Sequence, residues 1–198
     1  DRRQRQMCIR DRKKIHLLKT ESGNHVVLRD FIKDVGAPTW IRSDRAQSKI
    51  GKDWTKVCLT FYIKQATTEA GHPQQNMAER PIGDLKRRVS IMLHKTGADP
   101  IFWCYASEYA IDCDNYSWME SRKSVPYIKQ WGITPDISVF RFAFWDPIEY
   151  LDPDSPFPNE KLLKGRFLGI AWNVGDAFTY WIIPEKDPKS TRWPKVLA

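Results

Sequence analysis

The chain has 198 residues, 41% of them hydrophobic and nine of them tryptophan, which allows one domain or a core with a small annex. Thirty-two basic side chains against 24 acidic ones give a net charge of +8, which favours a polyanionic partner. No apolar run approaches the roughly 20 residues of a membrane span and no signal peptide is recognisable, so we expect a soluble intracellular protein with no membrane partner.

Residues 1–12, DRRQRQMCIRDR, have almost no apolar periodicity. The MCIRDR within them is similar to the translated end of a sequencing-library adapter, so we interpret residues 1–12 as a non-native leader and exclude them from fold prediction. The alternative is a basic arm that binds nucleic acid. The segment carries five arginines and two aspartates, and removing this net +3 leaves a chain with +5.

The next stretch predicts alternating helices and strands. A helix is expected from Gly23 to Val35, because its apolar residues recur at helical spacing (Val26, Val27, Phe31 and Ile32). TWIRSD predicts a short buried strand over residues 39–42, leading to Asp44. Residues 51–62 predict a helix with one apolar face (Trp54, Val57, Cys58 and Phe61), and residues 63–70 predict the next strand.

A loop, AGHPQQNMAER, then leads into a long predicted helix from Met77 to about Thr96. Asn76 is a good N-cap, and Pro81 is tolerated because it falls in the first turn. Residues 99–117 predict a further helix, apolar on most sides and therefore buried. Strand and helix alternating in this way predict an α/β fold.

The composition changes after residue 120. Residues 121–137 contain two prolines and a glycine and are interpreted as a linker, and residues 138–198 predict short strands over 138–145, 165–173 and 175–184. Aromatic residues are expected to form a small β core there (Phe140, Phe142, Phe144, Phe167, Trp172, Phe178, Tyr180 and Trp181). Residues 138–198 hold eight basic and eight acidic side chains, so the positive excess lies in the first part.

Neither cysteines nor histidines form a metal-binding pattern. The four cysteines have no CxxC-like spacing, and three of them are interpreted as small core residues in a reducing compartment (Cys58, Cys104 and Cys113). The four histidines form no zinc-ligand set.

Two carboxylates remain as candidate metal ligands. Asp44 follows a predicted strand, at the edge where ligands gather in open α/β sheets, and Glu79 begins a helix 35 positions later. Such a pair can bind Mg²⁺, which prefers oxygen ligands. The ordinary alternative for Glu79 is a first-turn glutamate that stabilises the helix dipole.

WIRSDRAQ (40–47) followed by GHPQQNMAER (71–80) resembles the integrase catalytic core of Ty1/copia retrotransposons, a retroviral-type, RNase H-like fold. Residues 102–115 and 125–144 resemble later parts of that core, and residues 165–182 resemble the small SH3-like segment downstream, so the resemblance covers roughly residues 20–183. It implies that Asp44 and Glu79 are catalytic ligands of Mg²⁺ (or Mn²⁺), the second and third members of a D,D-35-E triad. The implied reaction is phosphoryl transfer that joins the 3′ ends of element cDNA to host DNA.

The chain departs from the family pattern at two places. The triad's first aspartate belongs to a strand before Asp44 for which the sequence has no room, and Asp30 and Asp34 lie on the predicted helix as surface charges. Arg45 stands where the family usually has asparagine, and its guanidinium competes with a metal ion. We therefore expect an integrase core that lacks its first strands and is inactive by itself.

The DNA contacts are expected around the loop and the helix after it. At about 100° per residue, Gly83 and Lys86 share the face of Glu79, and Arg80 and Arg87 flank it. The predicted contacts with the DNA are Gln74, Gln75, Asn76, Arg80, Lys86, Arg87 and Arg88. The alternative for residues 86–88 is a solvated helix face.

These observations predict three parts after the leader: a partial RNase H-like α/β core over residues 13–120, the linker over 121–137, and an SH3-like β-barrel over 138–198. The expected partners are element cDNA ends and target DNA, with homo-oligomers in the full-length protein, in the nucleus or a cytoplasmic virus-like particle. Two other hypotheses remain: a non-catalytic nucleic-acid-binding remnant of the same fold, and a structural α/β protein with incidental basic charge.

Overall fold

The computed structural model describes residues 3–9, 12–18, 23–43, 51–68, 79–120, 123–151, 158, 162–172, 174, 178–185 and 195–197. The chain divides into two compact units, residues 1–84 and 85–198, and the division falls inside one helix. Each unit is described by itself. No helix in the described part of the chain is long and apolar enough to cross a membrane.

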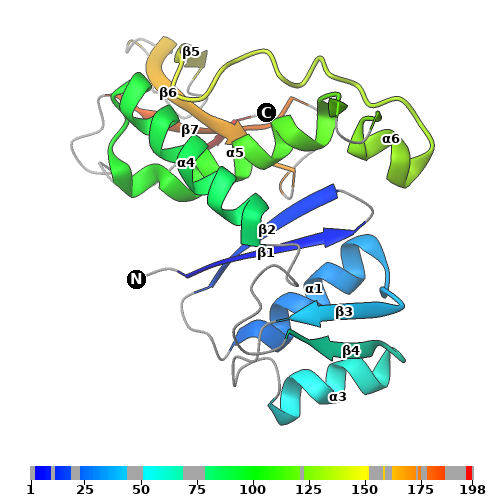
Figure 1. Cartoon of the computed structure of the whole chain (residues 1–198). Helices are drawn as coiled ribbons and strands as arrows, with labels where there is room; N and C mark the ends of the chain where they lie inside the picture. The colour runs from blue at the N-terminus through cyan, green and yellow to red at the C-terminus, as the bar shows by residue number, and fades with distance from the viewer. Residues whose placement is uncertain are drawn as a thin grey trace. The chain divides into compact units, whose positions relative to one another are not determined.

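Unit 1 contains two small sheets and two helices (Figure 1). Strands β1 (Arg3–Ile9) and β2 (Arg12–Leu18) form an antiparallel hairpin, with Arg3 opposite Leu18 and Ile9 opposite Arg12. Strands β3 (Trp40–Ser43) and β4 (Lys64–Thr67) are parallel neighbours. The helices are α1 (Asn24–Val35) and α3 (Lys52–Thr60), which confirms both helices predicted for this region.

The core of unit 1 lies between α1, α3 and the β3–β4 pair. It consists of Leu28, Ile32, Trp54, Val57, Cys58 and Ile63, with Ile41 of β3 packed against it. Parallel strands need a crossover connection, and α3 provides it between β3 and β4. The β–α–β order predicted from the sequence is therefore confirmed.

Three apolar positions in unit 1 differ from the prediction. The strand over 39–42 was expected to be buried, but β3 alternates, with Trp40 48% exposed and Ile41 facing the core. Val26 and Phe61 were placed on buried helix faces and are 49% and 40% exposed. The core covers only one face of this two-stranded sheet and only one stripe of each helix, and Leu28 takes the buried place on α1.

Residues interpreted as a leader take part in the β1–β2 hairpin, whose strands were not predicted. Among the described residues this hairpin and the β3–β4 pair are separate sheets without hydrogen bonds between them. The interpretation of residues 1–12 as a non-native leader stays a prediction.

Unit 2 holds most of helix α4 (Glu79–Thr96), then a 3₁₀ turn η3 (Pro100–Phe102), α5 (Trp103–Tyr116) and the short α6 (Pro126–Trp131). An antiparallel sheet follows, in the order β5 (Pro147–Leu151), β6 (Leu162–Ile170), β7 (Tyr180–Pro184) and β8 (Lys195–Leu197). Helix α5 packs against β6, and its buried residues confirm the predicted buried helix. The chain thus has a mixed α/β fold.

Helix boundaries in unit 2 follow local chemistry. The Asp99 carboxylate accepts a hydrogen bond from the backbone N–H of Ile101 at 2.8 Å, and Pro100 starts the 3₁₀ turn. The segment predicted as a linker contains α6, which Pro126 begins and Gly132 ends with φ of 72°. Only glycine adopts this left-handed conformation without strain, so the linker prediction overlooked a proline–glycine pair that bounds a helix.

The predicted strand over residues 138–145 was wrong, because no strand lies there. Its backbone groups bond locally: the N–H of Phe140 donates to the Ile137 carbonyl, and the N–H of Ala143 donates to the Asp146 carboxylate at 2.7 Å. The Tyr109 hydroxyl donates to the Phe142 carbonyl at 3.1 Å. The alternating phenylalanines still pack on the core, which shows that burial of aromatic rings and not sheet pairing accounts for the alternation.

The strands predicted over 165–173 and 175–184 are confirmed as β6 and β7. Of the predicted aromatic core, Phe144 and Phe167 are buried, whereas Trp172 and Phe178 are 48% and 40% exposed. The free cysteines Cys58 and Cys104 are buried and Cys113 is half-buried, which confirms them as packing residues.

Candidate metal and nucleic-acid site

The carboxyl ends of β3 and β4 lie side by side in unit 1. Ser43 is the register partner of Thr67, and the backbone N–H of Thr68 donates to the Ser43 carbonyl at 3.0 Å. The chain leaves this edge twice, from Ser43 toward Asp44 and from Thr68 toward the segment that precedes Glu79. Ligands bind at such carboxyl edges in open α/β sheets, which is where the sequence predicted the site.

Four of the predicted site residues lie outside the described residues: Asp44, Gln74, Gln75 and Asn76. Their roles stay predictions. Within the described part of the chain, no group of three or more histidine, cysteine, aspartate or glutamate side chains could hold a metal ion. Of the two predicted metal ligands, the described part contributes Glu79.

Helix α4 carries the other predicted residues. Glu79 lies in its first turn and is exposed, as are Arg80, Lys86 and Arg87. Leu85 and Val89 are the buried residues of the helix, so the exposed residues lie on its polar side. Glu79 and Lys86 are seven positions apart, about two helical turns, and therefore share one face.

Arg88 differs from its neighbours because it is engaged within unit 2. Its guanidinium forms a two-pronged ion pair with Asp114 of α5, Nη1 with Oδ1 and Nη2 with Oδ2, the second contact at 2.6 Å. The Asp114 side chain is 14% exposed and that of Arg88 39% exposed. This ion pair joins α4 to α5. The run of basic residues 86–88 in the sequence did not predict this role for Arg88.

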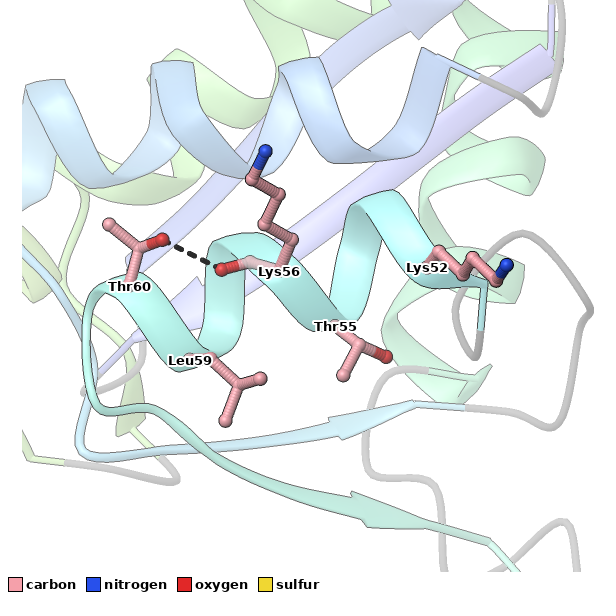
Figure 2. A pocket seen from close by; sticks show the side chains of 5 residues that line it. All are labelled: Lys52, Thr55, Lys56, Leu59 and Thr60. Atoms are coloured by element: carbon pink, nitrogen blue, oxygen red, sulfur yellow. Dashed lines mark hydrogen bonds between the residues drawn. The ribbon is translucent and has the colours of Figure 1, made fainter.

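A shallow depression of about 380 Å³ lies on the outer side of α3 (Figure 2). Lys52, Thr55, Lys56, Leu59 and Thr60 line it. The Thr60 hydroxyl donates to the Lys56 carbonyl at 2.8 Å, and Figure 2 shows the Lys56 side chain directed away from Thr55 and Leu59. The lining groups do not converge on one point, so we assign no site to this depression.

The sequence interpretation missed Trp40 and Arg42 of β3. The Arg42 guanidinium lies over the Trp40 ring, 4.8 Å from its centroid, a cation–π contact on the exposed face of the β3–β4 pair. The signal available in the sequence was their spacing, because residues two apart in a strand leave the same face.

Glu108 of α5 is a half-buried carboxyl in unit 2 that the sequence interpretation also passed over. Burial away from water, together with the nearby Asp112 carboxylate, raises the pKa of Glu108 to about 7. Asp112 itself accepts a hydrogen bond from the Trp172 indole N–H at 2.8 Å. Glu108 and Asp112 therefore form a pair of carboxyls on one helix, in which burial favours the protonated form of Glu108.

We expect Glu108→Gln to stabilise the protein above neutral pH. The folded-state pKa of about 7 lies above the unfolded value of 4.5, so unfolding releases protons between these values and stability falls as pH rises through this window. The penalty is complete above about pH 7, on the order of 2 kcal/mol, and absent below about pH 4.5. Urea unfolding at pH 4.5 and 8 measures it.

The exposed Glu149→Gln on β5 is the matched control, because it removes the same charge without removing a buried one. A difference between the Glu108 variant and the parent that is the same at both pH values would contradict the assignment.

No protein-family model and no curated protein matches the chain. Solved structures do. The catalytic core domain of HTLV-2 integrase, in complex with magnesium in its dimeric form, has a TM-score of 0.50 at 14% identity, over 66% of this chain and 92% of that one. The catalytic core of BIV integrase gives 0.50 at 14% identity, over 65% and 91%.

An intasome of simian T-cell lymphotropic virus, in complex with a PP2A regulatory subunit, covers 92% of this chain and 74% of its own, with a TM-score of 0.51 at 12% identity. The chain is similar in fold to retroviral integrase catalytic cores. At these identities the similarity establishes the RNase H-like integrase-core fold and no more, so it supports the predicted α/β core without distinguishing retrotransposon from retroviral relatives.

Proposed function

We propose that this chain is part of a Ty1/copia-type retrotransposon integrase, a Mg²⁺-dependent phosphoryl transferase that joins element cDNA 3′ ends to host DNA. One observation carries the proposal: in a chain with the integrase-core fold, parallel strands β3 and β4 end side by side, with Asp44 one residue beyond β3 and Glu79 on the first turn of the next helix. That order of strand, strand and helix supports placing the two motifs of the sequence at one sheet edge.

The donor chemistry fits a magnesium ion. Asp44 and Glu79 would hold Mg²⁺ (or Mn²⁺) through carboxylate oxygens, and the exposed position of Glu79 leaves its carboxylate accessible to a hydrated cation. When bound, the ion activates the attacking hydroxyl and stabilises the leaving oxygen. The chain's own residues orient the DNA: Gln74, Gln75, Asn76, Arg80, Lys86 and Arg87 would bind its phosphates, and Arg88 would add positive potential from its place beside Asp114.

In this proposal the segment after the core has a separate role. We infer that the β5–β8 sheet belongs to an SH3-like barrel that serves assembly of the full-length protein, in the nucleus or a virus-like particle. Its sequence, residues 138–198, has balanced charges, so it is not the main DNA contact. One of the structural neighbours is an intasome, which supports a homo-oligomer for the full-length protein.

We expect the double variant Lys86→Ala/Arg87→Ala to bind duplex DNA about tenfold more weakly than the parent near 0.1 M salt. Each neutralised phosphate releases condensed counterions, so losing two contacts should lower the slope of log K against log salt by about 1.8. Fluorescence anisotropy with a labelled duplex across a salt series measures both.

The control is Lys123→Ala/Lys164→Ala, which removes the same charge from exposed positions of unit 2. Equal losses for the two double variants would mean that net charge and not the α4 face binds the DNA. Binding too weak to detect in the parent itself would favour the structural α/β protein with incidental charge.

A strand-transfer assay with Mg²⁺ separates the proposed integrase from the alternative, a non-catalytic nucleic-acid-binding remnant. The alternative is favoured by one feature, Arg45 next to Asp44, because its guanidinium would compete with a metal ion. We expect no joining by the chain as it stands, and we expect Arg45→Asn to strengthen metal binding before it raises activity. If the chain as it stands joins DNA ends and Glu79→Gln does not, the inactivity proposal fails and the integrase assignment survives.

A further inference from the structure

In the described part of unit 1, one face of the β3–β4 pair carries an exposed aromatic ring and exposed cations. Ile41 points to the core of unit 1, so Trp40 and Arg42 leave the opposite face. Lys64 is the register partner of Trp40 in the parallel pair and leaves the sheet on the same side. All three side chains are exposed, Trp40 by 48%.

The details of this face suit a nucleotide. The Arg42 guanidinium lies 4.8 Å from the centroid of the Trp40 ring, a contact that fixes the orientation of the indole before any ligand arrives. Ala66, the register partner of Arg42, is small, so it does not fill the surface beside the arginine. The Trp40 ring offers a surface on which a base can stack, and the Arg42 and Lys64 cations can each bind a phosphate.

We propose that Trp40, Arg42 and Lys64 bind an unpaired stretch of DNA, with a base stacked on the indole and the two cations on the phosphates. The proposal rests on the proposed function, and it deepens it by naming single-stranded DNA as the form that this face recognises. Charge complementarity selects the occupant, because the whole net charge of +8 lies in residues 1–137. Duplex DNA keeps its bases stacked on one another and presents only phosphates to such a surface.

The test compares three labelled probes on the whole chain: a single strand of about 12 nucleotides, the same strand without bases, and the duplex. Fluorescence anisotropy should show the base-free strand binding the parent about tenfold more weakly than the normal strand, since base stacking supplies that part of the affinity. Trp40→Ala should weaken single-strand binding about tenfold and duplex binding less than twofold, whereas Trp40→Phe should keep most of the single-strand affinity.

The matched control is Trp118→Ala in unit 2. Trp118 is also exposed, by 60%, but its indole N–H donates to the Glu120 carboxylate, so this tryptophan lies beside an anion and not a cation. The Trp118→Ala variant should bind all three probes with the affinity of the parent. Arg42→Ala should lower both the single-strand affinity and its salt slope by about one unit.

Equal binding of the normal and base-free strands would overturn the proposal, and this comparison needs no variant. So would an equal loss of single-strand and duplex binding in Trp40→Ala, which would indicate an electrostatic contact without stacking. The proposed function fails separately: if Lys86 and Arg87 prove irrelevant to duplex binding while base-dependent binding through Trp40 persists, the single-strand surface stands and the α4 interface does not.

Discussion

Phe167→Ala is expected to lower the free energy of unfolding of unit 2 by about 3–5 kcal/mol. Phe167 is completely buried in the middle of β6, the second strand of the antiparallel sheet. Its ring lies 5.8 Å from that of Tyr109 of α5, 5.6 Å from that of Phe142 and 5.5 Å from that of Tyr180, measured between centroids. Truncation therefore removes the transfer free energy of the ring and two edge-to-face contacts, with Tyr109 and Tyr180, and leaves a cavity.

The same residue holds the irregular segment before β5 through its backbone. The N–H of Phe167 donates to the Asp146 carbonyl at 3.0 Å, and its carbonyl accepts from the N–H of Trp145 at 2.7 Å. Alanine keeps these bonds, so the loss measures side-chain packing. Urea unfolding followed by circular dichroism measures the effect.

Leu162→Ala is the control, since Leu162 lies on the same strand but is 44% exposed, and it should cost less than about 1 kcal/mol. Similar losses for the two variants would mean that the aromatic cluster is not the core of unit 2.

Arg88→Ala is expected to cost about 3 kcal/mol, the second largest effect. It leaves the Asp114 carboxylate, only 14% exposed, without the guanidinium that holds both of its oxygens. Removing one partner of an ion pair is costly where the other charge stays desolvated, as that of Asp114 does. Because Arg88 is 39% exposed, we expect a loss no larger than the lower end of the roughly 3–5 kcal/mol found for fully buried pairs. The double variant with Asp114→Ala should recover part of it, which a double-mutant cycle measures by thermal or urea unfolding.

Arg87→Ala is the matched control, one position away on the same helix, exposed and of the same charge. It should change stability by less than about 0.5 kcal/mol and weaken DNA binding, whereas Arg88→Ala should lower stability more and DNA binding less. If the folded Arg88→Ala variant loses as much DNA affinity as Arg87→Ala, then Arg88 contacts DNA as the sequence predicted, and its main role is not the ion pair with Asp114.

The order and type of most elements could be predicted from the amino-acid sequence. Helical spacing of apolar residues predicted α1 and α3, an N-cap and a first-turn proline predicted the start of α4, and an apolar stretch predicted α5. TWIRSD and the stretch after α3 predicted the two parallel strands. Those signals are local, because periodicity and end signals act within one element. The motif that ends at Glu79 was also readable, since it lies within one short stretch of chain.

Packing between elements sets which side of each element is covered and which charges form ion pairs. Trp40 looks like a core residue in the sequence and is half exposed, because the core covers one face of the β3–β4 pair. Arg88 looks like its neighbours Lys86 and Arg87, but Asp114, 26 residues later, lies across from it on α5. Glu108 has an ordinary place in a helix and an unusual pKa, because desolvation depends on atoms that packing brings around it. Burial, ion pairing and pKa are set by neighbours distant in sequence, and the spacing of residues along a single element does not encode them.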